Sequence, residues 1–506
     1  MRLVLGLVLA LWGAGTQALT ADQLWARWQG NLAALGVTLE AEGTAQVSGG
    51  LDLTGVTLRA TAPMKAAAGA FRLDRMTLRD QNDAVVVTPG AELRLTLSPE
   101  VSDLALLVTQ AGLVVTVSDR TGGVAYDFAA TSVALGGTAT FDAGYAADVG
   151  VEPPRGTMTG RITATGISGS WTDATAALRD MGLHLALTAM TYDGRKDDPK
   201  LHLGGQFSGT KSDLRYDLHL ALPLDAGFAA LMDGATPAAV AQRLTAALKA
   251  GLSVDLQASG GAERQQTSTG MRGQVVDTDL DSKAATSSLG FDRAGFHLAS
   301  QIQGMTLRLH APNLPVPQIA GSFGRAVFAI SGPLIGDVAQ PFGLRLALDG
   351  LVADAAIWDK RDPAQRLPRD PMSVNIDLSG RAHVDLLGMM AADQGGMTEV
   401  AKPRIDRVDV AALAFRGLGV ALAGSGAFAF DNTGDVPVPV GKAEMTLNGF
   451  GGLLDNLVAL GIVQPAQATQ VRLVLALGFD GTGDTLVSRV VTGADGSVTV
   501  NGQRMR

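Results

Sequence analysis

The sequence feature that most constrains the fold is an alternation of apolar and polar residues with a period of two. It is clearest at 214–222 (LRYDLHLAL), where every second residue is apolar or aromatic and Arg215, Asp217 and His219 lie between. Further segments show the same alternation: 92–98, 305–310, 344–352 and 374–379. Because successive side chains of a strand point to opposite faces, this pattern predicts antiparallel sheet with one apolar and one hydrated face.

The composition agrees with a sheet-rich chain. Its 506 residues include 63 glycines, whereas aromatic residues make up only 5%, which favours many turns over a helix-dominated globule. The hydrophobic fraction of 46% is enough for a large core. We therefore predict a mainly β fold, with elongated antiparallel sheets and a few amphipathic covering helices.

Three amphipathic helices carry recognisable end signals. Thr20 and Gln23 form a capping box at the start of the first helix. Thr236 and Pro237 begin the second, and the third begins at Phe450. We expect these helices to cover sheet faces.

The first helix carries two tryptophans, Trp25 and Trp28. On an amphipathic helix, such side chains more often pack onto a sheet, and we predict that arrangement here. Contact with a membrane interface is the alternative.

A glycine cluster within 441–463 lies between a predicted strand and the third helix, where a phosphate-binding loop would also lie. Such a loop requires Gly-Lys followed by Ser or Thr. The nearby Gly441-Lys442 precedes the strand and is followed by Ala443. We therefore interpret the cluster as a corner of the fold.

The corner motif Gly-Phe-x-x-Leu-Met/Leu-Asp begins at Gly227 and again at Gly449, and an alternating segment follows each, at 251–260 and 471–481. We predict that both segments are strands and that the chain has two related halves, with chance similarity as the alternative. The predicted organisation is an N-terminal β-rich half at 19–258, a polar linker at 259–274 and a C-terminal β-rich half at 275–506.

Residues 1–18 are typical of a secretory signal peptide. Arg2 precedes an apolar segment, and Thr16 and Ala18 are small residues that suit cleavage after Ala18. The apolar segment is too short to cross roughly 30 Å of hydrocarbon, and no later stretch predicts a transmembrane helix. We therefore predict a periplasmic mature chain.

Charge and cysteine content restrict the chemistry. The net charge is −9, whereas nucleic-acid binding requires concentrated lysine and arginine, so we predict no nucleic-acid partner. The chain has no cysteine, which excludes disulfides, zinc–thiolate sites and thiol nucleophiles.

No pattern predicts a catalytic, cofactor-binding or metal-binding residue. Asp277, Asp279 and Asp281 resemble the start of a calcium loop but lack its glycine and glutamate, so we interpret them as the polar side of a strand, with weak cation binding as the alternative. The charged segment 357–371 is interpreted as a solvated loop, with partner docking as the alternative. The histidines lack zinc-site spacing and are interpreted as solvent-facing: His184, His202, His219, His297, His310 and His383.

The segment 430–463 is joined to the terminal segment 495–506 (DGSVTVNGQRMR). With LTADQLWARWQ after the signal and with 342–371, it resembles the bacterial family called domain of unknown function 2125. That resemblance implies an exported, envelope-facing protein and supplies no catalytic residues. More loosely, the strand, glycine corner, helix and terminal hairpin resemble the ends of AsmA-like envelope proteins, which form elongated sheets with an apolar groove and are linked to lipid movement.

Function depends on what covers the apolar side of so much one-sided sheet, because leaving it in water is costly at roughly 25 cal/mol per Å². A closed core predicts a non-enzymatic envelope scaffold, which is our first expectation. An open face predicts a groove for acyl chains, and an unrecognised enzyme is the third possibility. The expected partner is an envelope lipid or an envelope protein.

Overall fold

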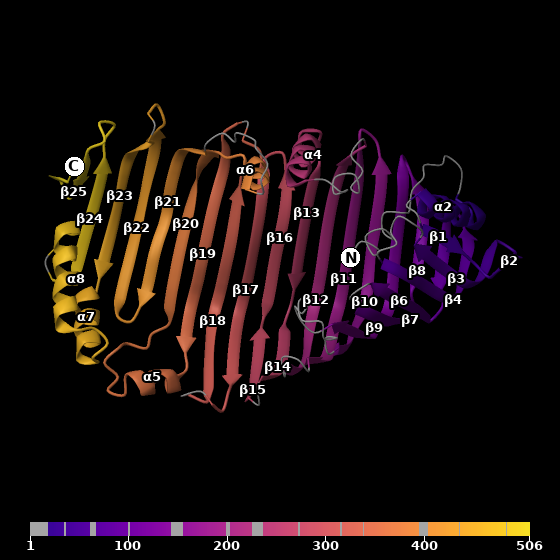
Figure 1. Cartoon of the computed structure of the whole chain (residues 1–506), viewed down its shortest axis with the longest axis horizontal. Helices are drawn as coiled ribbons and strands as arrows, with labels where there is room; N and C mark the ends of the chain where they lie inside the picture. Colours follow the sequence, from indigo (N-terminus) through magenta and orange to yellow (C-terminus); the bar gives the residue numbers. More distant parts are fainter. Residues whose placement is uncertain are drawn as a thin grey trace, which may run out of the picture. The chain divides into compact units, whose positions relative to one another are not determined.

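The protein is mainly β. The computed structural model describes residues 19–34, 37–60, 67–99, 102–142, 155–198, 203–224, 236–271, 274–313, 316–336, 338–393, 403–434, 436–481 and 483–505. These residues form six helices and 26 strands, and the strands belong to one antiparallel sheet (Figure 1). The predicted fold class is thus confirmed, whereas the predicted signal peptide at 1–18 lies outside the described residues.

The chain divides into two compact units. Unit 1 comprises residues 1–224, 255–281 and 309–314, and unit 2 comprises 225–254, 282–308 and 315–506. The segment 259–274, predicted to be a polar linker, instead contains the end of the strand Ser253–Gly260 and the whole of the strand Glu263–Met271. Exposed and partly buried positions alternate along this second strand, although nearly all of its residues are polar. Composition alone therefore predicts a loop.

Unit 1 is built around one helix and a series of antiparallel strands. Its elements are α2 (Ala21–Ala34), β1 (Val37–Glu40), β2 (Gly43–Val47), β3 (Gly50–Ala60), β4 (Ala67–Gln81), β5 (Ala84–Pro89), β6 (Glu92–Pro99), β7 (Ser102–Ala111), β8 (Val114–Arg120), β9 (Gly123–Asp142), β10 (Arg155–Thr175), β11 (Leu178–Asp198), β12 (Leu203–Pro223), most of β13 (Ser253–Gly260), β14 (Glu263–Met271) and β15 (Gln274–Ser282).

A closed hydrophobic core, called the α2 core below, lies between helix α2 and the strands β3, β4, β5, β8 and β9. Its central side chains are at most 1% exposed: Leu24, Leu51, Leu53, Leu78, Val85, Val117 and Val124. The capping box is present as predicted, because Thr20 N donates to Gln23 Oε1 (3.0 Å) and Gln23 N donates to Thr20 Oγ1 (3.3 Å). Burial of each leucine contributes about 1.5–3 kcal/mol.

Polar contacts fix how α2 lies on this core. Arg27 forms an ion pair with Asp119 on β8 (2.7 Å), and the Trp28 indole N–H donates to the Tyr126 hydroxyl on β9 (3.4 Å). Burial raises the pKa of the Tyr126 phenol. Trp25 is only 8% exposed, so both tryptophans pack on the sheet as predicted.

The long strands of unit 1 keep one polar and one apolar face, but the phase of the alternation reverses once along each strand. In β12 the exposed positions are even-numbered up to Thr210 and odd-numbered from Asp213, whose φ is +52°. In β11 the same change follows Thr188, which lies opposite Gly166 of β10 (φ +59°). Thr188 Oγ1 donates to Gly166 O (3.5 Å). These residues form a reversal row across the strands, and the alternation predicted at 214–222 holds on one side of it.

Glycines in the strands accommodate aromatic rings from the neighbouring strand. A Cβ at Gly194 would lie 2.3 Å from the ring of Phe207, which is opposite in register. The same close approach occurs at four further register pairs: Phe128–Gly169, Tyr192–Gly209, His297–Gly290 and Phe342–Gly380. Any larger residue at these glycines would collide with the ring.

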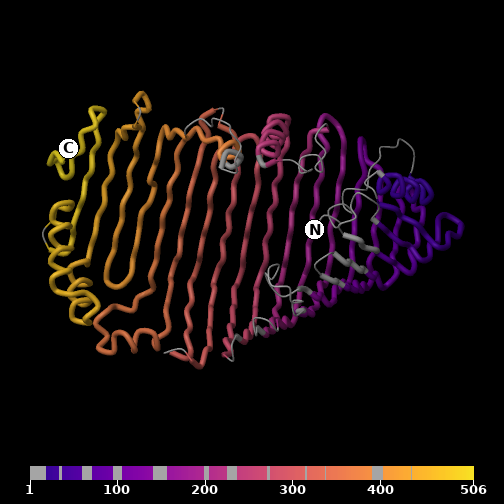
Figure 2. Tube along the Cα trace, viewed as in Figure 1, coloured from indigo at the N-terminus to yellow at the C-terminus, as the bar shows by residue number. Residues whose placement is uncertain are grey.

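Unit 2 continues the antiparallel pattern and contains the remaining described helices. Its elements are α4 (Pro237–Lys249), β16 (Ala284–Asp292), most of β17 (Gly295–His310), β18 (Gln318–Gly332), β19 (Gln340–Ala353), α5 (Ala355–Arg361), β20 (Met372–His383), α6 (Leu386–Asp393), β21 (Arg404–Gly417), β22 (Val420–Asp431), β23 (Val438–Asn448), α7 (Phe450–Ala459), α8 (Pro465–Gly478), β24 (Thr485–Thr492), β25 (Val498–Val500) and β26 (Gln503–Arg504). Consecutive strands from β18 to β24 pair with one another, and their traces run side by side in Figure 2.

Two predicted helices of unit 2 and the terminal hairpin are confirmed. Thr236 accepts from Ala239 N at the start of α4 (3.4 Å). Gly449 begins α7 with φ +75°, where a side chain would be strained, so this glycine cluster is a corner between β23 and α7. The matching corner at Gly227 lies outside the described residues. Strands β24 and β25 pair around a turn at Gly496.

The prediction of a strand at 471–481 is wrong, because most of this segment belongs to helix α8. Leucine, alanine, glutamine and arginine favour helix, and Pro465 at the first turn and the Gln464–Gln467 capping box start it. Period-two alternation over so short an apolar segment does not distinguish strand from helix. The helix is exposed along most of its length, and Ala468 is its one buried residue.

The segment 357–371 is mostly exposed, as predicted, but it is not structureless. Helix α5 occupies its start, and the carboxylate of Asp362 is completely buried. That carboxylate accepts from the backbone N–H groups of Leu367 (2.8 Å) and Arg366 (2.9 Å), and the hydrogen bond from Leu367 is the main reason why the pKa of Asp362 is lowered. The segment is therefore a loop folded around one buried acid.

Candidate functional site

The first candidate surface is the apolar face of strands β18 to β24, called the open face below. Register pairing places one row of residues across all seven strands: Phe328, Leu346, Ile376, Leu413, Gly424, Met445 and Ser488. Two flanking rows lie on the same face, one on each side of this row. The first consists of Ile330, Leu344, Leu378, Val410, Gly426, Ala443 and Val490. The second consists of Ala326, Leu348, Val374, Phe415, Leu422, Leu447 and Leu486. All members except Ser488 are apolar or glycine.

The opposite face of the same strands carries their charged side chains, together with small residues such as Ala414 and Ala423. Arg345 lies across from Asp377, at 3.9 Å between Nε and Oδ2, and Arg489 pairs with Glu444 at 3.4 Å. Asn375 also occupies this face, opposite Ala347. The strands of unit 2 thus have the one-sided character that the alternation predicted.

The apolar side chains of the open face remain partly exposed in the described part of the chain. Phe328 is 39% exposed and Leu413 is 37% exposed. Among the apolar side chains of β18–β24 that the structure describes, only Ala382, Val420 and Leu447 are buried, and these lie at strand ends. Helix α7 contacts β22 near that end. The middle of the open face therefore differs from an ordinary protein core, in which such residues are buried.

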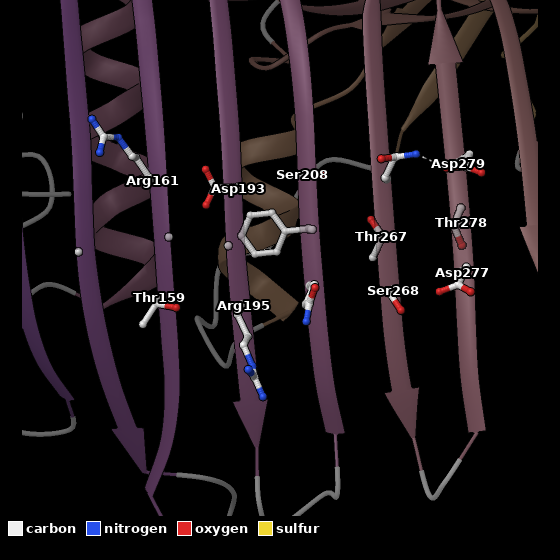
Figure 3. Close-up of a pocket in the computed structure, with 16 residues that line it drawn as sticks. Thr159, Arg161, Asp193, Arg195, Ser208, Thr267, Ser268, Asp277, Thr278 and Asp279 are labelled. Atoms are coloured by element: carbon white, nitrogen blue, oxygen red, sulfur yellow. Dashed lines mark hydrogen bonds between the residues drawn. The ribbon is translucent and has the colours of Figure 1, made fainter.

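The second candidate surface, called the polar groove below, lies on unit 1 and has a volume of about 720 Å³ (Figure 3). Two rows of polar side chains border it. One row contains Arg161, Asp193, Ser208, Gln266 and Asp279, and the other contains Thr159, Arg195, Gln206, Ser268 and Asp277. Because the rows are two residues apart along each strand, both belong to the same face of the sheet.

Between the two rows runs a floor that begins with three glycines. Gly137, Gly160 and Gly194 are successive partners on β9, β10 and β11. Phe207 follows on β12, and its ring packs against Gly194. Because side chains alternate between the two faces of a strand, the Phe207 ring lies on the opposite face, and the floor between the two polar rows is strand backbone.

The residues singled out from the sequence lie in several different places. Asp277 and Asp279 border the polar groove, as alternate residues of β15, and Asp281 pairs with Arg264 (2.8 Å). Their placement on one strand agrees with the interpretation from sequence. Among the residues that the structure describes, no group of three or more histidine or acidic side chains is arranged to hold a metal ion.

Four of the histidines lie on exposed strand positions, and a fifth is partly exposed. His184 contacts the Asp217 carboxylate, and His219 contacts Asp180 (2.9 Å). His383 lies 3.3 Å from Asp406. His297 and His310 are exposed on β17, and His202 lies outside the described residues.

Sequence reasoning missed the polar groove. Its residues come from β9, β10, β11, β12, β14 and β15, and only strand register brings them together. The available signal is the run of polar residues in β14 (ERQQTSTGM), which composition alone predicts to be a linker.

Comparison of this chain with protein-family models, with curated protein sequences and with solved structures gave no match. The resemblance to domain of unknown function 2125 and to AsmA-like proteins therefore stays a prediction. In the described part of the chain, no helix combines the length and the apolar character that crossing a membrane requires.

Proposed function

We propose that this chain is an exported, non-enzymatic binding protein that accommodates the acyl chains of envelope lipids on the open face of β18–β24. The observation that carries the proposal is the set of three apolar rows across seven strands. Phe328 and Leu413, both in the middle row, remain more than one-third exposed. The exported location rests on the signal-peptide pattern at 1–18.

The chemistry of the open face favours hydrocarbon over a peptide strand. The backbone groups of the interior strands are already paired within the ladder, so a peptide gains no main-chain hydrogen bonds on this face. Apart from Ser488, the residues of the three rows are apolar or glycine, and covering them removes apolar area from water at about 25 cal/mol per Å².

The dimensions of the open face also suit acyl chains. Seven strands at about 4.8 Å spacing extend about 29 Å across. A bilayer core about 30 Å thick holds two layers of acyl chains, so one chain fits along this distance. A scaffold role, our first expectation from sequence, instead requires that a partner protein cover the same rows.

The test is native mass spectrometry of the mature protein purified gently from the periplasm, with extraction of co-purifying molecules. We expect stoichiometric phospholipid or fatty acid. A matched pair of variants on β19 localises the binding: Leu346→Glu places a charge on the open face, and Ala347→Glu places it on the polar face one residue away. Fluorescent phosphatidylethanolamine should bind to wild type and Ala347→Glu, and at least tenfold more weakly to Leu346→Glu.

Circular dichroism provides the folding control for both variants, and the polar groove of unit 1 is unchanged in each. An unliganded mass that stays constant after incubation with envelope lipids would overturn the proposal. Equal binding of the lipid by the two folded variants would overturn it as well. Either result would shift attention to the scaffold role.

A further inference from the structure

We propose that the polar groove of unit 1 is a second binding site, and that its ligand is a linear, uncharged polyhydroxylated chain such as a glycan. The proposal concerns a different surface and a different ligand class from the acyl-chain site. Its observations are the unused hydrogen-bonding groups along the groove, their balance of charge and the geometry of the floor.

Four of the five charged groups that border the groove, Arg161, Asp193, Arg195 and Asp277, make no polar side-chain contact with another described residue. Arg161 and Asp193 are direct register partners, yet within the described residues neither forms an ion pair or a side-chain hydrogen bond. Arg195 and Asp277 likewise lack such a partner there. Among the described side chains of the two rows, one hydrogen bond is formed, and it lies within a single row: Gln266 Nε2 donates to Asp279 Oδ1 (3.0 Å). Figure 3 shows it as a dashed line.

Elsewhere on the same polar face, opposite charges do pair. His219 contacts Asp180 (2.9 Å) on β12 and β11, and Arg264 contacts Asp281 (2.8 Å) next to the groove. The strands therefore permit cross-strand ion pairs at such positions. In the groove, the guanidinium of Arg161 and the carboxylate of Asp193 keep their full capacity to donate and to accept.

The mixture of charges selects the ligand class. Two arginines and three aspartates border the groove, which gives a formal charge of −1, from +2 and −3. An anionic polymer would meet three carboxylates and is disfavoured. Hydroxyl groups both donate and accept, so a polyol satisfies arginine, aspartate, glutamine and serine along the same groove.

The geometry of the groove suits an extended chain. The two rows lie about 7 Å apart, since they are separated by two residues of strand, and strands recur every ~4.8 Å along the groove. A sugar ring has similar dimensions, so successive rings meet successive strands. The residues between the two rows direct their side chains to the opposite face of the sheet, so none of them would hold a ring away from the backbone of the floor.

Binding of maltohexaose, cellohexaose and chitohexaose to the mature protein, measured by isothermal titration calorimetry, tests the proposal. We expect at least one of them to bind. Arg161→Ala and Asp193→Ala should each weaken binding about tenfold to hundredfold, because each removes hydrogen bonds that involve a charged group. Arg215→Ala is the matched control, since Arg215 is an exposed arginine on β12 outside the groove.

Failure of all three oligosaccharides to bind would overturn the proposal, and so would equal weakening by Arg215→Ala. Tighter binding of a polyanion, with polyphosphate as the probe, would also contradict it. Leu346→Glu should leave oligosaccharide binding unchanged, so this test and the lipid test succeed or fail separately.

Discussion

The α2 core and the open face are built from the same kinds of residue but end in different environments. Leu78 on β4 and Leu346 on β19 both lie on the apolar side of an alternating strand. Leu78 is completely buried, because α2 and the short strands close over it, whereas Leu346 remains partly exposed. Alternation thus determines which side chains share a face, whereas a separate covering element determines whether that face becomes a core.

Between buried and exposed regions, we expect the largest difference in the free energy of unfolding when one partner of an ion pair is removed. Arg179 and Asp173 form a bidentate pair in unit 1, with distances of 3.0 and 2.6 Å, and their side chains are 9% and 6% exposed. Arg179→Ala leaves a buried carboxylate without this partner, so we expect a loss of about 3–5 kcal/mol in the free energy of unfolding. Urea denaturation followed by circular dichroism provides the measurement.

Arg345→Ala is the matched variant on unit 2, because Arg345 and Asp377 are 3.9 Å apart with side chains 49% and 38% exposed. Its expected cost is about 0–1 kcal/mol. Similar costs for the two arginine variants would show that the distinction between buried and open pairs is incorrect.

Leucine truncation tests the same distinction without charge. Leu78→Ala leaves a cavity in the α2 core and should cost about 2–5 kcal/mol. Leu346→Ala removes a side chain that is already partly in water, so we expect less than about 1.5 kcal/mol. Hydrogen exchange localises each effect, and strong loss of protection around β19 in Leu346→Ala would mean that the open face is covered in solution.

The cap of α2 provides a smaller effect. Thr20→Ala removes the oxygen that accepts from Gln23 N, and we expect a loss of about 0.5–2 kcal/mol because α2 closes the core. Fluorescence of Trp25 and Trp28 during urea denaturation reports this change. Thr20→Ser keeps the hydroxyl and should restore most of the stability; if it behaves like alanine, the cap contributes nothing.

The smallest expected effect is the pH dependence of the loop around Asp362. Its pKa in the folded state lies below the unfolded value of about 3.9. The stabilisation is therefore present above the unfolded pKa and is lost as pH falls through the folded pKa. Hydrogen exchange of residues 362–369 between pH 5 and pH 2 should show this loss, and Asp362→Asn should remove the dependence on pH.

Much of the fold could be predicted because its signals are local. The capping box at Thr20 and the cap at Thr236 depend on residues three positions apart, and both predicted helices are present. The alternation at 214–222 similarly places Leu214 and Leu218 on one face and Arg215 on the other. Antiparallel sheet follows from such segments without any knowledge of their partners.

The remainder depends on register and on competing propensities. No local pattern predicts the change of phase at Asp213 or Gly166. The segment 471–481 alternates like a strand but begins with the signals of a helix, and the helix signals decide. The polar groove joins residues from six strands, so strand pairing must be known before Arg161 and Asp193 can be placed together.

The reversal row has a consequence for how the strands of unit 1 choose their partners. In a sheet of uniform alternation, a strand can slide by two residues and still present the same face. Strand β11 cannot, because a slide would move its change of phase at Thr188 away from Gly166 and Asp213 and put polar side chains among apolar ones between them. The reversal row therefore favours a single pairing register for three strands of about twenty residues each.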